Sequence, residues 1–273
     1  MSIPKVINYC WFGKGQLPPK AIDCINSWKK YCPDYTIVRW DESNFDVNKY
    51  DFTREAYEKK KWAFVTDVAR LDIIYNNGGI YLDTDVEIIK NIDDILDNEL
   101  FIGFENSEYA NTGLGFGAIQ GNKLVKKNLD VYKEISFNDC NCISKIACPI
   151  ITSKVLIEKG FKMNGKLQTL NGCTIYPVEY FCPMNYDTGK IKITENTYSI
   201  HHYTASWKSK FEMMNYNIEK KFNILFIKLL GEKNGKNFSH KIAKGISIFL
   251  KPFFRNKENW NEWMQTNNFY SNL

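Results

Sequence analysis

The sequence predicts an α/β domain with a mixed central sheet, followed by a basic helical tail. The first forty residues read strand, helix, strand, the order in which α/β domains begin. A long amphipathic segment then ends at two glycines and gives way to residues of alternating polarity. The last quarter, from Lys208 onward, carries 12 Lys or Arg against 5 Asp or Glu, although the whole chain has a net charge of only +5. The 273 residues, 44% of them hydrophobic, are enough for one substantial core.

The N-terminal elements are predicted from β-rich runs and from a helix that starts at proline. Residues 5–13, KVINYCWFG, form a β-rich run that ends in glycine. Pro18 and Pro19 precede a segment in which Ile22, Ile25 and Trp28 fall on one side of a helix. Residues 36–40, TIVRW, are the predicted second strand.

A long helix is predicted over residues 53–76, and NNGG should stop it because Asn and Gly readily adopt the left-handed conformation of helix ends. One apolar stripe of this helix runs from Phe64 to Tyr75 at helical spacing. The neighbouring stripe contains Asp67 and Arg70, so an acid and a base are expected at a partly buried position.

After Gly79 the pattern changes to period two, which predicts a strand over residues 80–88. Tyr81, Asp83, Asp85 and Glu87 then share one face. Two carboxylates at close range repel each other and are costly to desolvate, so a cation or a shared proton is expected beside them. Oxygen ligands favour Mg²⁺ or Mn²⁺. The alternative is a solvated strand end with two surface aspartates.

Residues 105–122 are rich in Gly and Asn, which predicts a loop that approaches a ligand. Asn111, Thr112 and Gly113 are the ligand-binding candidates within it, and an ordinary loop is an equal alternative. ACPIITSKVLIEKG predicts a helix after Pro149, without assigned chemistry.

With these motifs the chain resembles the glycosyltransferases that carry an Asp-x-Asp motif, specifically glycosyltransferase family 32, and is similar to the glucosyltransferase domains of clostridial toxins. The stretches that carry the resemblance are IPKVINYCWFG, WAFVTDVARLDIIYNNGGIYLDTDVE and the segment from TIYPVEYF to IHHYTASW. The resemblance implies a GT-A fold, with a Rossmann-like nucleotide-binding domain over residues 1–207. Residues 208–273 are then a basic amphipathic helical extension.

The resemblance also implies roles for residues on the donor side. Ile7 and Trp11 lie where relatives hold the nucleotide base, and the Trp11 ring falls where they stack uracil. Asp67 and Arg70 take positions near the donor sugar, the ribose and the diphosphate, and Asp83 takes the position that touches sugar or ribose hydroxyls. Core packing of Trp11 and an intrahelical ion pair between Asp67 and Arg70 remain alternatives.

The metal site implied by the resemblance contains Asp85, Asp83 and one histidine from the C-terminal signature. His201 and His202 are adjacent on a predicted strand, so only one should reach the ion; His202 is preferred by analogy with related retaining enzymes. The following Ser206 and Trp207 take positions near the phosphates. Relatives usually carry glycine immediately before this pair, whereas this chain has Ala205.

The implied reaction is metal-dependent sugar transfer with retention of configuration, using Mn²⁺ or Mg²⁺ and a nucleotide sugar, with a UDP-sugar favoured by Trp11. A glycan or lipid-linked oligosaccharide is the expected acceptor, in bacterial surface-polysaccharide synthesis. One alternative is a protein acceptor, as in the toxins. A second is a phosphatase of the haloacid-dehalogenase type, because YLDTDVE is also similar to the nucleophile motif of those enzymes. A third is a catalytically silent protein that binds a nucleotide sugar or serves as a scaffold.

The basic tail predicts a peripheral membrane contact. FNILFIKLL and KIAKGISIFLKPFFRN alternate apolar residues with lysines, as amphipathic helices on an anionic membrane do, and neither is long enough to span a bilayer. The alternative is that these helices cover the core. Nucleic-acid binding is not expected, because no recognised module accompanies the charge.

The eight cysteines form no Cys-x-x-Cys pair, and the N-terminus lacks a secretory pattern. A cytoplasmic location, extending to the cytoplasmic face of the membrane, is therefore expected. A zinc cluster of Cys140, Cys142 and Cys148 is a weak alternative because the spacing fits no known finger type. The sequence does not indicate an oligomeric state.

Overall fold

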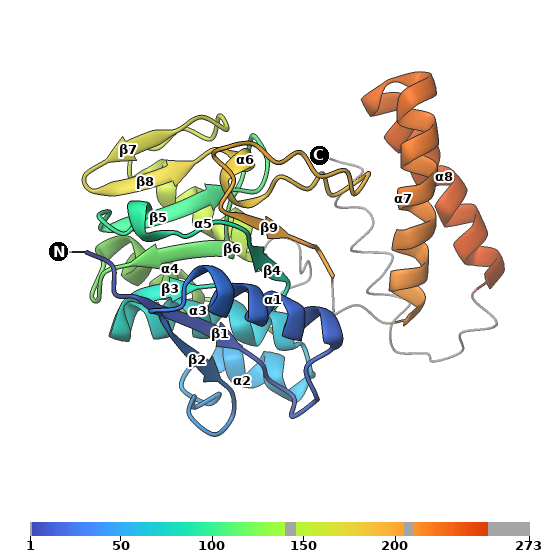
Figure 1. Cartoon of the computed structure of the whole chain (residues 1–273). Coiled ribbons are helices and arrows are strands. Elements are labelled where there is room, and N and C mark those ends of the chain that lie inside the picture. Colours follow the sequence, from blue (N-terminus) through green and yellow to red (C-terminus); the bar gives the residue numbers. More distant parts are fainter. Residues whose placement is uncertain (1, 140–145, 205–209, 251–273) are drawn as a thin grey trace. The chain divides into compact units, whose positions relative to one another are not determined.

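The computed structural model describes residues 2–139, 146–204 and 210–250 (Figure 1). The first half contains, in chain order, β1 (Val6–Cys10), α1 (Pro19–Tyr31), β2 (Thr36–Trp40), α2 (Asp51–Glu58), α3 (Trp62–Asn77), β3 (Gly79–Tyr81), β4 (Val86–Ile88), the 3-10 turn η1 (Asp93–Ile95) and β5 (Leu100–Phe104). The second half contains β6 (Ala110–Ala118), α4 (Lys123–Lys133), α5 (Cys148–Glu158), β7 (Gln168–Leu170), β8 (Cys173–Tyr176), α6 (Val178–Phe181), β9 (Ser199–His201), α7 (Lys210–Leu230) and α8 (Glu232–Leu250).

The central sheet is mixed, as predicted. Its seven strands lie in the order β2-β1-β3-β6-β5-β8-β7. β1 is parallel to β2 and β3, whereas β6 is antiparallel to both β3 and β5. Helices form the layer that packs against this sheet: α3 packs against β1, β3 and β6, and α5 packs against β6. The predicted α/β fold class is confirmed.

The predicted long helix is two helices. α2 ends at Glu58 and α3 begins at Trp62. Between them Lys60 has a φ of 57°. The backbone N–H of Lys60 bonds to the carbonyl of Tyr57 and that of Lys61 to the carbonyl of Ala56, which is the pattern of a Schellman C-cap. The prediction missed this break because a lysine, rather than a glycine, occupies the left-handed position. The far end is as predicted, since α3 stops at Gly78, whose φ is 68°.

The predicted strand over residues 80–88 is also interrupted. β3 ends at Tyr81 and β4 begins at Val86, with a turn between them. β4 leaves the central sheet and pairs antiparallel with β9 in a separate two-stranded sheet, in which Val86 is opposite His201. α1 holds β4 in this place, because the buried Trp28 donates its indole N–H to the Val86 carbonyl at 2.7 Å. Asp83 and Asp85 thus lie in the turn rather than on a strand.

The glycine-rich segment predicted as a loop is mostly a buried strand. All nine residues of β6 are buried. The glycines make room for neighbouring aromatic rings: a Cβ on Gly117 would lie 2.4 Å from a ring carbon of Phe101 on β5. Glycine therefore serves close packing here, which composition alone does not distinguish from a loop.

The chain divides into two compact units. The first contains residues 1–183 and 192–202, and the second contains residues 184–191 and 203–273. The core of the first unit lies between the sheet and α2 to α5. In the second unit α7 and α8 pack on one another, and the 184–191 segment joins them through Tyr186, whose carbonyl accepts a hydrogen bond from the Tyr216 hydroxyl.

Six cysteines within the described residues are buried and form no disulfide: Cys10, Cys24, Cys32, Cys148, Cys173 and Cys182. Cys140 and Cys142, from the zinc alternative, lie outside the described residues. Across residues 2–139, 146–204 and 210–250, no helix combines the length and the apolar character needed to cross a membrane.

Candidate active site

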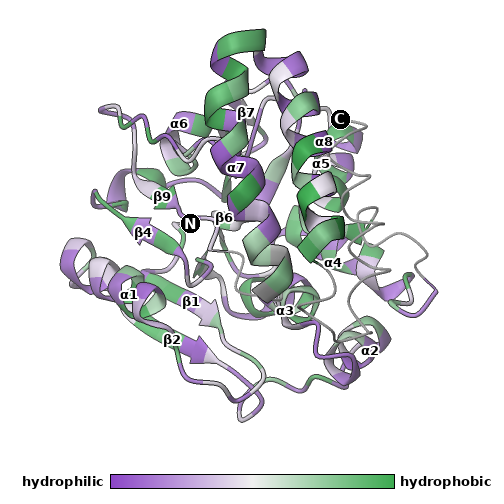
Figure 2. Cartoon of the chain, turned by 90° about the vertical axis from the view of Figure 1, so that its right-hand side faces the viewer, coloured by the Kyte–Doolittle hydropathy of each residue, from purple (hydrophilic) through white to green (hydrophobic). Residues whose placement is uncertain are grey.

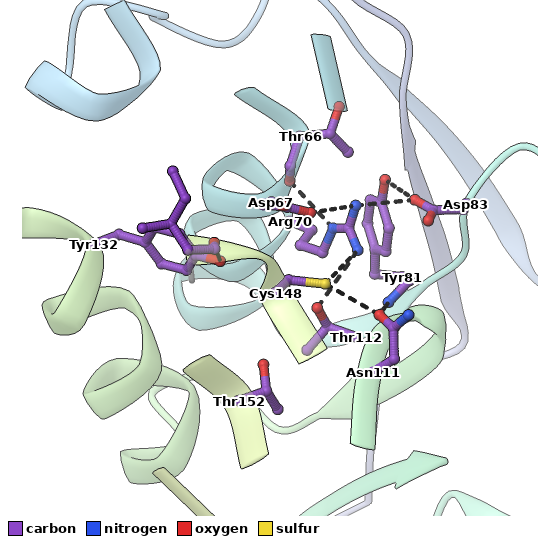
Figure 3. Close-up of polar contacts among 12 residues, drawn as sticks. Thr66, Asp67, Arg70, Tyr81, Asp83, Asn111, Thr112, Tyr132, Cys148 and Thr152 are labelled. Carbon is purple, nitrogen blue, oxygen red and sulfur yellow. Dashed lines mark hydrogen bonds and ion pairs between the residues drawn. The ribbon is translucent and has the colours of Figure 1, made fainter. Parts of the chain in front are cut away.

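A buried arginine joins the two predicted carboxylates of the donor side (Figure 3). Arg70 and Asp67 stand one turn apart on α3, and Asp83 follows the end of β3. One terminal nitrogen of Arg70 lies 3.1 Å from Asp67 Oδ1 and 3.2 Å from Asp83 Oδ1. The guanidinium therefore connects the helix with the turn that carries the aspartate pair, in addition to the intrahelical ion pair.

Further contacts fix Arg70 from three other elements. Its second terminal nitrogen lies 3.5 Å from Thr112 Oγ1 on β6 and 3.7 Å from Cys148 Sγ at the start of α5. Its guanidinium carbon lies 4.9 Å from the centre of the Tyr81 ring. The Tyr81 hydroxyl donates to Asp83 Oδ1 at 2.9 Å. The charge of Arg70 is thus held in one orientation before any ligand arrives.

Burial dominates the electrostatics of these groups. It raises the pKa of Asp67 to about 6, against the opposing effect of Arg70. It also raises the pKa of Asp83, and the nearby Asp85 adds to this while Arg70 opposes it. For Arg70, burial alone favours the neutral form, but Asp83 and Tyr81 hold its pKa well above the ordinary value. The cluster combines a permanent cation with carboxylates that are costly to ionise.

β6 comes closest to this cluster at Gly113. A Cβ at this position would lie 2.5 Å from Asp83 Oδ2 and 2.9 Å from an Arg70 terminal nitrogen. The backbone N–H of Gly113 bonds to Asn111 Oδ1 at 2.6 Å, and Cys148 Sγ donates to the same oxygen at 3.1 Å. The three candidates Asn111, Thr112 and Gly113 are therefore part of the Arg70–Asp83 cluster.

A second group of ligands adjoins the first through Asp83. Asp83, Asp85 and His201 offer one ligand atom each, and these atoms all lie within 4.8 Å of one another. His201 Nε2 lies 3.2 Å from Asp85 Oδ1. The pairing of β4 with β9 produces this meeting, because it places His201 beside Val86, next to Asp85 in the chain.

His202 points to a different partner. Its Nε2 lies 2.7 Å from Glu87 Oε2, and Lys20 approaches the same carboxylate oxygen at 3.4 Å. Only its backbone N–H reaches Asp85, through a bond to the Asp85 carbonyl. The two histidines face opposite ways, as expected for neighbours on a strand, but the geometry favours His201 rather than the preferred His202 as the metal ligand.

The Asp83–Asp85–His201 group fits a divalent cation. Burial opposes the protonation of His201, yet Asp85 holds its pKa well above the ordinary value. The two carboxylates therefore already attract positive charge to this place. Carboxylate ligands suit Mg²⁺ and Mn²⁺, and one imidazole among them favours the less oxygen-selective Mn²⁺.

The residues predicted to hold the nucleotide base lie at and after β1. Trp11 follows β1, is partly exposed, and donates its indole N–H to the Gly15 carbonyl at 2.7 Å. Ile7 is fully buried within β1, between Ile37 and Ile80 on the flanking strands. Neither joins the Arg70 cluster by a direct contact between described residues. Ser206 and Trp207 lie outside the described residues, as does Ala205.

Sequence reasoning missed Tyr81 and Cys148 as members of the cluster. Tyr81 lies two residues before Asp83 and was predicted to share its face, which was the available signal. Cys148 opens a helix that was predicted without chemistry, and nothing in the local pattern indicates that its thiol reaches Asn111 on β6. Both contacts depend on the packing of elements far apart in the chain.

The family comparison shows what this region resembles. Residues 18–102 match the family model described as the glycosyltransferase sugar-binding region containing a DXD motif. This segment is therefore similar to a DXD sugar-binding region. It contains Asp67, Arg70, Asp83 and Asp85, so the predicted resemblance to Asp-x-Asp glycosyltransferases is confirmed.

Two curated relatives match part of the chain. Inositol phosphoceramide mannosyltransferase 3 of Schizosaccharomyces pombe is 34% identical over 99 residues, which are 35% of this chain and 28% of that protein. Inositol phosphoceramide mannosyltransferase 1 of the same yeast is 26% identical over 125 residues, which are 41% of this chain and 39% of that protein. The chain thus matches well under half the length of these relatives.

Two solved structures are distantly similar to part of this chain. One is the PaToxG glycosyltransferase, with a TM-score of 0.48, 19% identity, and coverage of 58% of this chain and 69% of that one. The other is a glycosyltransferase involved in the glycosylation of the major capsid of PBCV-1, with a TM-score of 0.43, 13% identity, and coverage of 74% and 95%. These likenesses say nothing about chemistry.

Proposed function

We propose that the chain transfers a hexose from a nucleoside diphosphate sugar to a hydroxyl group, with Mn²⁺ as cofactor. The observation that carries this proposal is the pair of adjoining clusters that share Asp83. Arg70 offers a fixed positive charge, and Asp83, Asp85 and His201 offer three ligands for a divalent ion. Together they suit a diphosphate, whose negative charge grows as the sugar leaves.

Each residue has a defined part in this proposal. Asp85 and His201 would hold the ion, and Asp83 would both contribute to that shell and orient a donor hydroxyl. The ion, when bound, neutralises the leaving diphosphate. Arg70 lies where the diphosphate charge develops, and the contacts from Tyr81, Thr112 and Cys148 preorganise it, so little reorientation is needed during the reaction.

A same-face mechanism, with retention, agrees with the surroundings of the carboxylates. Asp67 pairs with Arg70, Asp83 with Arg70 and Tyr81, and Asp85 with His201. A covalent intermediate would need a carboxylate directed at the sugar carbon, and these three are already engaged. In the proposed step the bond from the anomeric carbon to the diphosphate oxygen breaks, and the acceptor oxygen bonds to that carbon on the same face. The acceptor proton passes to the leaving diphosphate.

A UDP-sugar is the proposed donor because Trp11, by the resemblance, takes the position at which relatives stack uracil, and its ring is partly exposed after β1, where it is accessible for stacking on a base. The acceptor is proposed to be a glycan or lipid-linked oligosaccharide, in bacterial surface-polysaccharide synthesis. The printed names of the yeast relatives describe mannose transfer to an inositol phosphoceramide. They support a lipid-linked acceptor and make GDP-mannose the second donor to test.

The experiment is hydrolysis of a donor panel without an acceptor, detected as released nucleotide. The panel contains UDP-glucose, UDP-galactose, their N-acetyl forms and GDP-mannose, each with Mn²⁺ and with EDTA. We expect Mn²⁺-dependent release from one UDP-sugar. Asp85→Asn should abolish it, whereas Asp97→Asn, which changes an exposed aspartate outside the site, should not.

Three results would contradict the proposal in different ways. An Asp85→Asn protein with full turnover would overturn the metal assignment. Release from GDP-mannose alone would replace the donor. Cleavage of p-nitrophenyl phosphate, with no nucleotide released from any sugar donor, would favour the phosphatase alternative.

A further inference from the structure

The α7–α8 hairpin is held together by small and polar residues. Every fourth residue of α8 is buried, and these residues are Gly235, Ser239, Ala243 and Ser247. A Cβ on Gly235 would lie 2.5 Å from the backbone nitrogen of Ile227, so the two helix backbones nearly touch near the turn. Toward the other end, the Ser247 hydroxyl donates to Asn215 Oδ1 at 2.6 Å. Small and polar residues, rather than large apolar ones, therefore line the buried side of α8.

Those large residues point outward instead. Leu225 is 51% exposed and Leu229 65% on α7, while Phe238 is 45% exposed and Phe249 84% on α8. Ring contacts join the two rows across the hairpin, because Phe226 lies 5.9 Å from Phe222 and 4.8 Å from Phe238 between ring centres. We call the combined surface the apolar face, formed by Phe222, Leu225, Leu229, Phe238 and Phe249.

Lysines border this apolar face. Lys221 and Lys228 lie four residues before and three after Leu225, and Lys241 lies three after Phe238, so each is a neighbour on the helix surface. All three are exposed, and none forms an ion pair with another described residue. The nearby acids are already paired, Glu219 with His240 and Glu232 with Lys236. The border therefore carries net positive charge.

We propose that the apolar face docks on the surface of a bilayer that contains anionic lipids. A helical hairpin in water usually buries its large apolar residues between its helices, whereas small residues at the contact and large ones outside are typical of helices packed in lipid. Lysine side chains at the border reach phosphate headgroups while their apolar stems stay near the acyl chains. Figure 2 shows apolar and polar bands alternating along both helices, as in helices that lie in the membrane interface.

A protein partner fits these observations less well. Protein–protein interfaces are depleted in lysine relative to the rest of the surface, whereas lysines border the apolar face on both helices. A protein partner would also leave unexplained why small residues line the buried side of α8. The charge and the apolar residues occur together on one surface, so a single anionic and apolar partner accounts for both. The docking concerns the second compact unit alone and does not depend on the proposed sugar transfer.

The test is cosedimentation of the full chain with vesicles. We expect binding to vesicles of phosphatidylcholine and phosphatidylglycerol, and much weaker binding to phosphatidylcholine alone. Leu225→Ser, Leu229→Ser and Phe249→Ser in combination should weaken the partition by at least about tenfold, because three exposed apolar side chains lose their insertion. The matched control changes three exposed apolar residues of the first unit, Ile22→Ser, Leu167→Ser and Ile193→Ser, and should bind like the wild type.

The lysines give an independent arm of the test. Lys221→Gln, Lys228→Gln and Lys241→Gln together should remove the preference for the anionic lipid, and high salt should have the same effect on the wild type. Circular dichroism should show unchanged helix content in every variant, because all the altered residues are exposed. Absence of binding by the wild type, or equal binding by the Leu225/Leu229/Phe249 variant, would overturn the proposal. The proposal would also be overturned if the wild type formed a dimer but bound no vesicles, and the Leu225/Leu229/Phe249 variant were monomeric. The apolar face would then be an interface between two copies of the chain.

Discussion

Gly113 is the residue at which backbone and chemistry come closest. The two charged groups that a Cβ would meet, the Asp83 carboxylate and the Arg70 guanidinium, are both held by other partners, Asp83 through its Oδ1 by the Tyr81 hydroxyl and Arg70 by Thr112, and have little freedom to move. Gly113→Ala should therefore displace the Asp83–Arg70 pair. We expect donor hydrolysis to fall by about a hundredfold, as for a misplacement of roughly 1 Å in other active sites, with only a moderate loss of stability.

The control for this prediction is Gly245→Ala on α8, where a Cβ would meet no atom within 4 Å. That change should leave donor hydrolysis unaltered and stabilise the helix slightly. Full hydrolysis by Gly113→Ala would show that the pair moves without harm, and that the close approach of β6 is not needed for turnover.

Asp67 should make stability depend on pH in a recognisable way. Its pKa is about 6 in the folded protein against 3.8 as the ordinary value. Between these pH values the unfolded chain ionises first, so the free energy of unfolding should fall as the pH rises from about 4 to about 6. The fall amounts to about 3 kcal/mol for a shift of this size. Urea unfolding at several pH values should show a steeper fall in the wild type than in Asp67→Asn, in which the raised pKa of Asp83 still contributes; equal slopes would contradict the assigned pKa of Asp67.

At the residue scale, the sequence predicted the acids and the base but not their partners. Asp67, Arg70, Asp83 and Asp85 are recognisable because one motif spans them all. The choice between His201 and His202 depends on how β9 pairs with β4, which is a long-range contact. The neighbours of Arg70 on β6 and α5 depend on packing in the same way, so no local pattern reveals them.

At the scale of elements, the break between α2 and α3 gives a prediction about the backbone. Lys60 is exposed and holds a φ of 57° without help from its side chain. Lys60→Gly should raise the free energy of unfolding by roughly 1 kcal/mol, because glycine adopts this conformation without the Cβ clash. Lys59→Gly is the control: Lys59 has an ordinary φ of −85°, so it should bring no such gain. Thermal unfolding would compare the two, and a gain at both positions or at neither would contradict the explanation.

The elements that sequence predicted well are those with a local cause. β2 occupies residues 36–40 as predicted, and α5 starts at Cys148 with Pro149 in its first turn. β6 was missed because its glycines fit against Phe101 of a neighbouring strand. The turn after β3 was missed because the alternation of polarity continues through it, although the backbone leaves one sheet and enters another.

At the scale of the whole molecule, the proposed ion would tie together distant parts of the first compact unit. Asp83 and Asp85 follow β3, whereas His201 lies on β9, more than a hundred residues later in the chain. An ion held by all three binds only the folded state, so it should stabilise that unit as a ligand does. At a concentration a hundred times its Kd, Mn²⁺ should add about 2.7 kcal/mol to the free energy of unfolding.

The stabilisation by Mn²⁺ shows which of the two histidines binds the ion, without any measurement of activity. Mn²⁺ should raise the Tm of the wild type and of His202→Gln by several degrees, and leave that of His201→Gln almost unchanged. Each variant is compared with itself without metal, so a loss of stability from the substitution alone does not affect the result. A metal-dependent rise in His201→Gln that is absent in His202→Gln would make His202 the ligand. It would also mean that the strand pairing of β4 with β9 changes when the ion binds, because His202 now contacts Glu87 rather than Asp85.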